Sequence, residues 1–149
     1  MKRKYRVFLD TSVIFAAILS STGGSRKLFR LGEVGLINLM IGPMILWECD
    51  RIVKEKSPGS LARLALFLDI GQVIVVDEAA NEEIDRTLAF MSYEPDAYVL
   101  AEAISAKPDW FVTHDKTHFL SGLRSVDLPF IVGTPGDFLQ MLADELASS

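Results

Sequence analysis

The chain has 149 residues, of which 50% are hydrophobic and 23% are charged, and its formal net charge is −5. This length and composition predict one globular domain over residues 1–149 and exclude a low-complexity chain. A lone cysteine, Cys49, excludes an intrachain disulfide and favours a reducing compartment. We interpret Cys49 as a small packing residue.

The first half of the chain alternates strand-like and helix-like patterns. An apolar strand is expected over Tyr5–Leu9, followed by a helix to Leu19 capped by Thr11 or Ser12. After a Ser/Thr/Gly loop, Ser25 is expected to cap a second helix, which ends near Glu33. A second strand over residues 36–41 and a helix from Pro43 to about Lys56 follow.

The second half continues the alternation. Helices are expected over residues 60–68, 81–90 and 94–106, and strands over residues 72–76, 110–113 and 130–132. Thr134 is expected to cap an amphipathic final helix. Strands that alternate with helices predict an α/β domain, with a parallel sheet covered on both faces.

The N-terminus has only part of the pattern of a secretory signal. Lys2-Arg3-Lys4 precedes a mostly apolar run, but Asp10 interrupts that run and no A-x-A cleavage site follows. The other long apolar stretch, residues 36–47, is split by Gly42-Pro43 and is shorter than the roughly 20 residues of a membrane helix. We therefore predict a cytoplasmic protein that does not associate with membranes.

Four carboxylates occupy positions that a soluble domain usually fills with apolar side chains. Asp10 and Asp115 follow predicted strands, whereas Glu48 and Asp96 lie on the apolar stripes of predicted helices. A buried carboxylate is costly unless it is paired or binds a metal, and the sequence offers no matching set of buried Lys or Arg. All four acids are therefore predicted to bind Mg²⁺ or Mn²⁺ and to catalyse metal-assisted hydrolysis of a phosphate ester.

The predicted topology also brings these acids to one edge. Asp10 and Asp115 lie at the carboxyl ends of parallel strands, where open α/β sheets form their sites, and Glu48 and Asp96 would reach in from neighbouring helices. Each acid taken alone has a structural alternative. Asp10 could cap a helix, Asp96 could complement a helix dipole, Asp115 could be a turn residue, and Glu48 could have a structural role.

The charge is divided unevenly along the chain. Residues 1–63 carry 11 Lys and Arg against five acids, whereas residues 64–149 carry four against 15. Such a division permits a basic face that binds a polyanion, although solvated helix surfaces would also explain it. Arg26, Lys27 and Arg30 are the candidate substrate-binding residues.

Several segments, in order along nearly the whole chain, are similar to the PIN-domain ribonucleases. They are Val7-Phe8-Leu9-Asp10-Thr11-Ser12-Val13, Ile45-Leu46-Trp47-Glu48, Pro95-Asp96-Ala97-Tyr98-Val99-Leu100-Ala101, Phe111-Val112-Thr113-His114-Asp115, and the ending 131–139. The segment Ser25-Arg26-Lys27-Leu28 resembles the VapC-type toxin branch of that family. Each motif is short, and it is their order and spacing that make the resemblance specific.

The resemblance implies a three-layer α/β/α sandwich with a central, mainly parallel sheet of about five strands. It implies that the four acids hold Mg²⁺ or Mn²⁺, with Thr11, Ser12 and Thr113 supporting them by hydrogen bonds. It further implies an endoribonuclease acting on RNA, a homodimer, and a cognate antitoxin. Many relatives carry one more acid two residues after the last aspartate, where this chain has Thr117, so we expect one tightly held ion.

Other interpretations stay open. Asp10-Thr11-Ser12 matches an aspartic-protease triplet, but no second copy exists, and an aspartyl-phosphate phosphatase would need an acid where Ser12 stands. His114 and His118 have a spacing that suits a metal on a helix, although no helix start is evident between them. A PIN fold that only binds RNA or a partner protein is the main non-enzymatic alternative.

Overall fold

The central sheet is built from the short apolar runs expected to form strands. In this computed structural model, which describes residues 4–148, five strands lie in the order β3-β2-β1-β4-β5. All pairings between them are parallel. They are β1 (Tyr5–Leu9), β2 (Ile37–Ile41), β3 (Ile74–Val75), β4 (Trp110–Val112) and β5 (Ile131–Gly133). The predicted parallel sheet of about five strands is confirmed.

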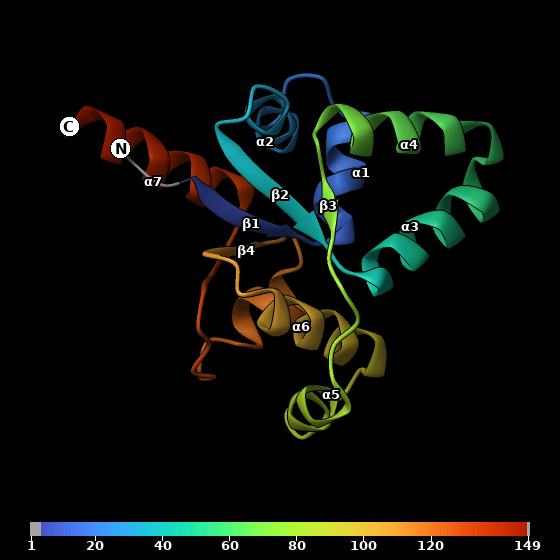
Figure 1. Ribbon diagram of the computed structural model, residues 1–149, viewed down its shortest axis with the longest axis vertical. Coiled ribbons are helices and arrows are strands. Elements are labelled where there is room, and N and C mark those ends of the chain that lie inside the picture. The colour runs from blue at the N-terminus through green and yellow to red at the C-terminus, as the bar shows by residue number, and fades with distance from the viewer. Residues whose placement is uncertain (1–3, 149) are drawn as a thin grey trace.

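Helices cover both faces of this sheet, as Figure 1 shows. The helices α1 to α4 lie on one side of it, and α5 and α6 lie on the other. Their bounds are α1 (Thr11–Leu19), α2 (Gly24–Glu33), α3 (Pro43–Lys56), α4 (Leu61–Ile70), α5 (Asn81–Leu88), α6 (Glu94–Ala106) and α7 (Pro135–Ala147). The fold is therefore a three-layer α/β/α sandwich, as expected.

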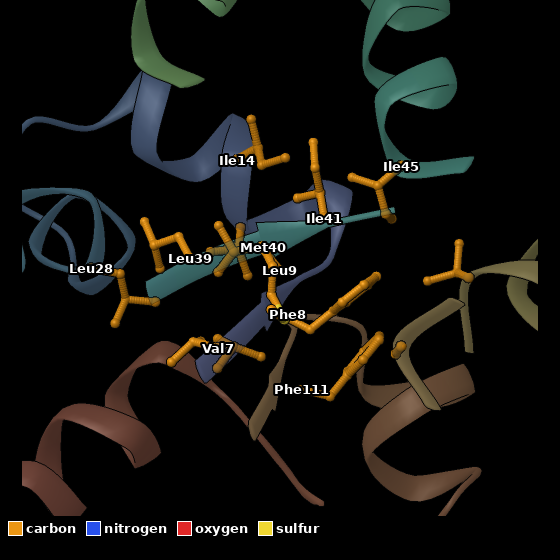
Figure 2. Close-up of a cluster of buried hydrophobic side chains, with 14 of the residues drawn as sticks. Val7, Phe8, Leu9, Ile14, Leu28, Leu39, Met40, Ile41, Ile45 and Phe111 are labelled. Atoms are coloured by element: carbon orange, nitrogen blue, oxygen red, sulfur yellow. The ribbon is translucent and has the colours of Figure 1, made fainter. Parts of the chain in front are cut away.

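The middle strands hold the core together. Phe8 of β1 and Phe111 of β4 are fully buried, and their stacked rings have centroids 5.6 Å apart. Figure 2 shows the two rings side by side. Each such ring contributes about 1.5–3 kcal/mol to the free energy of unfolding through its burial. The predicted packing role of Cys49 is confirmed, because its side chain is fully buried and burial raises the pKa of its thiol to about 12. This core fixes the ends of β1 and β4.

Two of the predicted helix caps are wrong. Asp10, rather than Thr11 or Ser12, occupies the N-cap position of α1, and Gly23 occupies that of α2. Ser25 is instead buried inside α2. The cap expected at Thr134 is confirmed, because its side chain accepts the Asp137 N–H in a complete capping box.

Several boundaries also differ from the prediction. The strand expected over residues 72–76 is only Ile74–Val75, because β3 is an edge strand that pairs with β2 alone. The helix expected to reach residue 90 ends at Leu88, and a short 3₁₀ turn, η1 (Pro58–Ser60), precedes α4. A π-helical turn, η2 (Lys116–Ser121), was not expected from the sequence.

Within residues 4–148 no helix is long and apolar enough to cross a membrane. Of the basic N-terminal residues considered above, Lys2 and Arg3 lie outside the described part of the chain.

The start of α3 is capped from another helix. Gly42, its N-cap residue, has no side chain, and both carboxylate oxygens of Glu102 in α6 accept the Met44 N–H, at 3.0 and 3.3 Å. A Cβ at Gly42 would collide with the Glu102 side chain. Burial raises the pKa of Glu102 to about 7, and the charge of Glu78 adds to this while the Met44 bond opposes it. Glu102 therefore fixes the helix that carries Glu48.

Glu102→Gln should change how stability depends on pH. Because the folded protein holds this proton more tightly than the unfolded chain, the stabilisation from protonated Glu102 is full below pH 4.5 and is lost as the pH rises through 7. An amide can still accept the Met44 N–H but does not titrate. The variant should therefore gain on the order of 1–2 kcal/mol over wild type between pH 4.5 and 8, after discounting for solvent screening. Urea unfolding at several pH values measures this difference, with the exposed Glu33→Gln as control. If the free energy of unfolding had the same pH dependence in wild type and in Glu102→Gln, the prediction would be contradicted.

Candidate active site

The predicted acids lie at the point where the strand order of the sheet reverses. The chain proceeds from β1 to β2 on one side, but β4 lies on the other side of β1. Open α/β sheets bind ligands at such a switch point, beyond the carboxyl ends of the strands. Asp10 follows β1 directly, and Asp115 lies three residues after β4. The register places Leu9 beside Val112, so both chain segments leave the sheet together.

Asp10 is buried, with 7% of its surface exposed, and two hydroxyls hold its carboxylate. Its Oδ2 accepts hydrogen bonds from Ser12 Oγ at 2.9 Å and from Thr113 Oγ1 at 2.8 Å. The side chain makes no capping bond to α1, so a helix cap does not explain this carboxylate. Burial raises the pKa of Asp10, while the bonds from Thr113 and Ser12 oppose that rise.

Thr113 and Ser12 also connect Asp10 to the segment after β4. Thr113 is fully buried, and its Oγ1 accepts the Asp115 N–H at 2.9 Å while it donates to Asp10. Ser12 Oγ accepts the His114 N–H at 3.0 Å while it donates to Asp10. Each hydroxyl thus donates a hydrogen bond to Asp10 and accepts one from a backbone N–H of the segment after β4. The relative position of Asp10 and Asp115 is therefore fixed.

Asp115 is partly buried, and both of its carboxylate oxygens contact His118. Its Oδ1 accepts the His118 N–H at 2.9 Å, which caps η2, and its Oδ2 lies 3.0 Å from His118 Nδ1. Burial acts to raise the pKa of Asp115, but the bonds from His118 outweigh it and lower that pKa. The bond to Asp115 raises the pKa of His118. The expectation that no helix starts between His114 and His118 is wrong, because η2 begins at Lys116.

Asp96 lies in the first turn of α6 and is 8% exposed. Its Oδ2 is buried and accepts no hydrogen bond from any residue in the range 4–148, and it lies 3.6 Å from His118 Nδ1. Burial raises the pKa of Asp96 to about 6; His118 opposes this, while the charges of three further acids, Asp115, Asp10 and Glu48, add to it. A helix dipole alone does not account for a carboxylate that is both buried and repelled by its neighbours.

Glu48 lies on α3, is half-buried, and receives one short hydrogen bond. Thr11 Oγ1 donates to its Oε1 at 2.6 Å. Thr11 follows Asp10 directly in the chain, so the first turn of α1 positions both acids. The hydroxyls of Thr11, Ser12 and Thr113 therefore each bond to one of the acids expected at the site.

The four acids are close enough to repel one another, but they do not form a closed cage. Within residues 4–148, no group of three or more His, Cys, Asp or Glu side chains is placed so that it could hold a metal ion with its side chains as they stand. In the same range, no Lys or Arg forms an ion pair with any of these acids. Among residues 4–148, the one basic side chain that forms an ion pair with these acids is His118, whose imidazole is charged only when protonated. The site is thus an acidic edge with little compensating charge.

The three basic residues expected to bind substrate differ in their contacts. The Arg26 guanidinium donates to the Ala17 carbonyl at 2.7 Å and lies over the Phe67 ring, so it joins α2 to α1 and α4. Lys27 is exposed, and Arg30 is exposed with one bond to the Ser21 carbonyl. The geometry therefore leaves Lys27 and Arg30 accessible, while Arg26 has a packing role.

One contact near the acids was not foreseen. Ser25 Oγ, buried at the start of α2, lies 3.0 Å from His114 Nε2. His114 and His118 therefore contact different partners, Ser25 and Asp115, and do not form a joint ligand pair. No spacing rule could have found this bond, because 89 residues separate its partners.

The sequence matches the family described as PIN domain over residues 6–117. The chain belongs to the PIN domain family. No curated protein matches it. The PIN match covers β2, β3 and β4, all of β1 except Tyr5, and all four acids.

Several solved structures share the fold. VapBC2 from Rickettsia felis, bound to a DNA fragment from its promoter, aligns with a TM-score of 0.67 at 16% identity over 85% of this chain and 96% of that one. PAE2754 from Pyrobaculum aerophilum aligns with a TM-score of 0.64 at 14% identity over 93% and 90%. Mycobacterium tuberculosis VapC20, described as a toxin that cleaves the sarcin-ricin loop, aligns with a TM-score of 0.51 at 14% identity over 74% and 91%. At these identities the likeness establishes the fold.

Proposed function

We propose that this PIN domain protein is a divalent-metal-dependent endoribonuclease and the toxin component of a toxin–antitoxin pair. The observation that carries the proposal is the uncompensated acid edge at the sheet switch point. Asp96 Oδ2 is buried without a hydrogen-bond donor, beside three further acids and without a Lys or Arg partner within residues 4–148. Such a group stabilises the fold only when a cation compensates it.

The donor set fits Mg²⁺ or Mn²⁺. Its atoms are carboxylate oxygens, which these hard cations prefer, and Mg²⁺ usually takes one or two carboxylates and keeps several waters, so a closed cage is not needed. Asp10, Asp96 and Asp115 would hold the ion, with Glu48 at its edge. When bound, the cation would polarise the phosphoryl oxygen, lower the pKa of the attacking water and stabilise the leaving oxygen.

The hydroxyl side chains of this protein would orient the acids. Ser12 and Thr113 hold Asp10, and Thr11 holds Glu48, so their oxygens keep fixed directions. Thr113 also ties Asp115 to Asp10. In the reaction the water oxygen bonds to phosphorus, the bond from phosphorus to the ribose 3′ oxygen breaks, and that oxygen takes up a proton. The products are a 5′-phosphate and a 3′-hydroxyl.

Single-turnover cleavage of a pool of RNA substrates tests the proposal. Cleavage should occur in Mn²⁺ or Mg²⁺, stop in EDTA, and leave 5′-phosphate and 3′-hydroxyl ends. Products with 2′,3′-cyclic phosphate would mean that the 2′-hydroxyl was the nucleophile and would overturn the mechanism. Absence of cleavage in metal would favour a module that only binds RNA or a partner protein.

Lys27 and Arg30 are expected to contact the RNA backbone. Replacing both by glutamine should weaken RNA binding and flatten its salt dependence, with about 0.7 lost from the log–log slope for each phosphate contact to a single strand. Arg26 should be left in place, because its guanidinium holds α1 and α2 together. Fluorescence anisotropy at several salt concentrations measures the slope. As a control, replacing Lys56 and Arg63 by glutamine removes the same charge and should leave the salt slope unchanged. An equal loss of slope in this control would mean that net charge, rather than contact of Lys27 and Arg30 with phosphates, sets the salt dependence.

The protein partner we propose is a cognate antitoxin. The structural likeness to VapBC2, whose structure contains DNA from the promoter of that pair, supports this assignment. The acid edge is a surface that a basic antitoxin segment could neutralise. We also expect a homodimer, which sedimentation of the purified chain tests.

A further inference from the structure

Two large aromatic side chains lie exposed next to the acid edge. Phe90 is 45% exposed and Tyr93 is 55% exposed, and both belong to the short link between α5 and α6, which lie together on one side of the sheet in Figure 1. Tyr93 is the residue before α6 and lies three positions ahead of Asp96. Neither ring belongs to the buried core. Their exposure therefore calls for an explanation other than packing.

The two rings line a hollow whose wall also includes one of the acids, Asp96. It has a volume of about 160 Å³, and Phe90, Tyr93, Asp96, Thr117 and His118 are among the residues around it. The Tyr93 ring is nearly parallel to the His118 imidazole, at an interplanar angle of 23° and a centroid distance of 6.2 Å. Because His118 is bonded to Asp115, this contact sets the Tyr93 ring at a fixed place relative to two of the acids.

We propose that this hollow binds an unpaired nucleobase, stacked on Tyr93 and Phe90, next to the phosphate that the acids act on. The inference rests on the proposed nuclease function and adds to it how the substrate is held. Proteins that bind single strands combine charged contacts to the backbone with aromatic rings on which bases stack. Here the aromatic face directly adjoins Asp96, so a base lying on it would bring its own phosphate to the acid edge.

The same arrangement defines the substrate class. A base can reach the two rings only if it is not stacked and paired inside a helix, so the site selects single-stranded loops or ends over duplex RNA. Ring faces accept any base, and the hydroxyls of Ser92 and Thr117 at the hollow can bond to a base edge. We therefore expect a requirement for unpaired nucleotides with only a modest sequence preference.

Tyr93→Ala and Phe90→Ala test this site. Each should raise the enzyme concentration that gives half-maximal single-turnover cleavage by about tenfold, which is within the range for loss of one stacked base. Tyr93→Phe keeps the ring and should stay within about twofold of wild type. The extended backbone of Tyr93 (φ −93°, ψ 113°) suits any of these residues. Leu36→Ala, which removes an exposed apolar side chain just before β2 at the opposite edge of the sheet, should change nothing.

A second readout separates this inference from the nuclease proposal. A single-stranded oligonucleotide with 2-aminopurine in place of one base should lose fluorescence when the base stacks on wild type, Tyr93→Phe and Leu36→Ala, but not on Tyr93→Ala. Unchanged half-saturation and unchanged quenching in Tyr93→Ala would overturn the base site while leaving the nuclease intact. The base site would also be overturned if Tyr93→Ala lost the Mn²⁺-induced rise in melting temperature. The Tyr93 ring would then act by holding the acids in place for the metal and not by binding a base. If wild type cuts no RNA in metal, the nuclease proposal fails, and quenching that depends on Tyr93 still supports the base site.

Discussion

Asp10→Asn is expected to reduce metal-dependent RNA cleavage by more than about 100-fold while the protein remains folded. The amide oxygen of asparagine can still accept the hydrogen bonds from Ser12 and Thr113, so the local structure should persist. What is lost is one negative charge at the acid whose position is most tightly fixed. Because burial raises the pKa of Asp10, removing its charge should leave the melting temperature equal or higher.

Single-turnover cleavage in Mn²⁺ by wild type and by the variant measures the effect. Asp69→Asn, an exposed change on α4 that removes the same charge, is the matched control and should cleave as wild type does. Equal activity in Asp10→Asn would assign the cleavage to another site or to a contaminant. It would then favour a protein that binds RNA or a partner without cutting.

The sheet could be predicted because its signals are local. Short apolar runs that alternate with capped helical segments specify a parallel α/β sheet, and the acids that follow β1 and β4 must then lie at one edge. The hydroxyls at Thr11, Ser12 and Thr113 lie next to those strand ends in sequence, and they bond to the acids for the same reason. Features that depend on neighbours along the chain were therefore within reach of the sequence.

Features that depend on distant contacts were not predictable. Glu102 caps α3 from 58 residues away, and Ser25 bonds to His114 across 89 residues. The packing role of Arg26 was not predictable either, because the sequence shows its charge but not the bond from its guanidinium to the end of α1. Each of these pairings arises from packing between elements, so neither spacing nor residue type indicates it.

His118 illustrates the same limit at the site itself. Thr117, where the resemblance to PIN-domain ribonucleases implies a further acid, lies in η2, an element that the sequence did not predict. That turn brings His118 Nδ1 to 3.0 Å from Asp115 and 3.6 Å from Asp96. An imidazole at this place compensates part of the acidic charge. The number of ions that the site holds stays a prediction.

Asp96→Asn is expected to stabilise the metal-free protein by on the order of 1 kcal/mol and to abolish its response to Mn²⁺. The reason is that Asp96 Oδ2 is buried without a donor, and three neighbouring acids raise the pKa of this carboxyl. Wild type should gain about 2.7 kcal/mol when Mn²⁺ is at 100 times its dissociation constant. For a chain of this size, each kcal/mol raises the melting temperature by about 2–4 °C.

Glu94→Gln provides the matched control for Asp96→Asn, because Glu94 lies in the same first turn of α6 but is exposed and outside the acid edge. It should lose only the favourable interaction with the helix dipole, about 0.3–1 kcal/mol, and keep the full Mn²⁺ response. Thermal melting of wild type and both variants, with EDTA or millimolar Mn²⁺, distinguishes the two roles. If metal-free Asp96→Asn instead melts lower than wild type by as much as Glu94→Gln does, Asp96 acts on the helix dipole. A wild-type melting temperature that does not move in Mn²⁺ would remove the basis for a metal at this edge, because a cation that binds only the folded state must raise it.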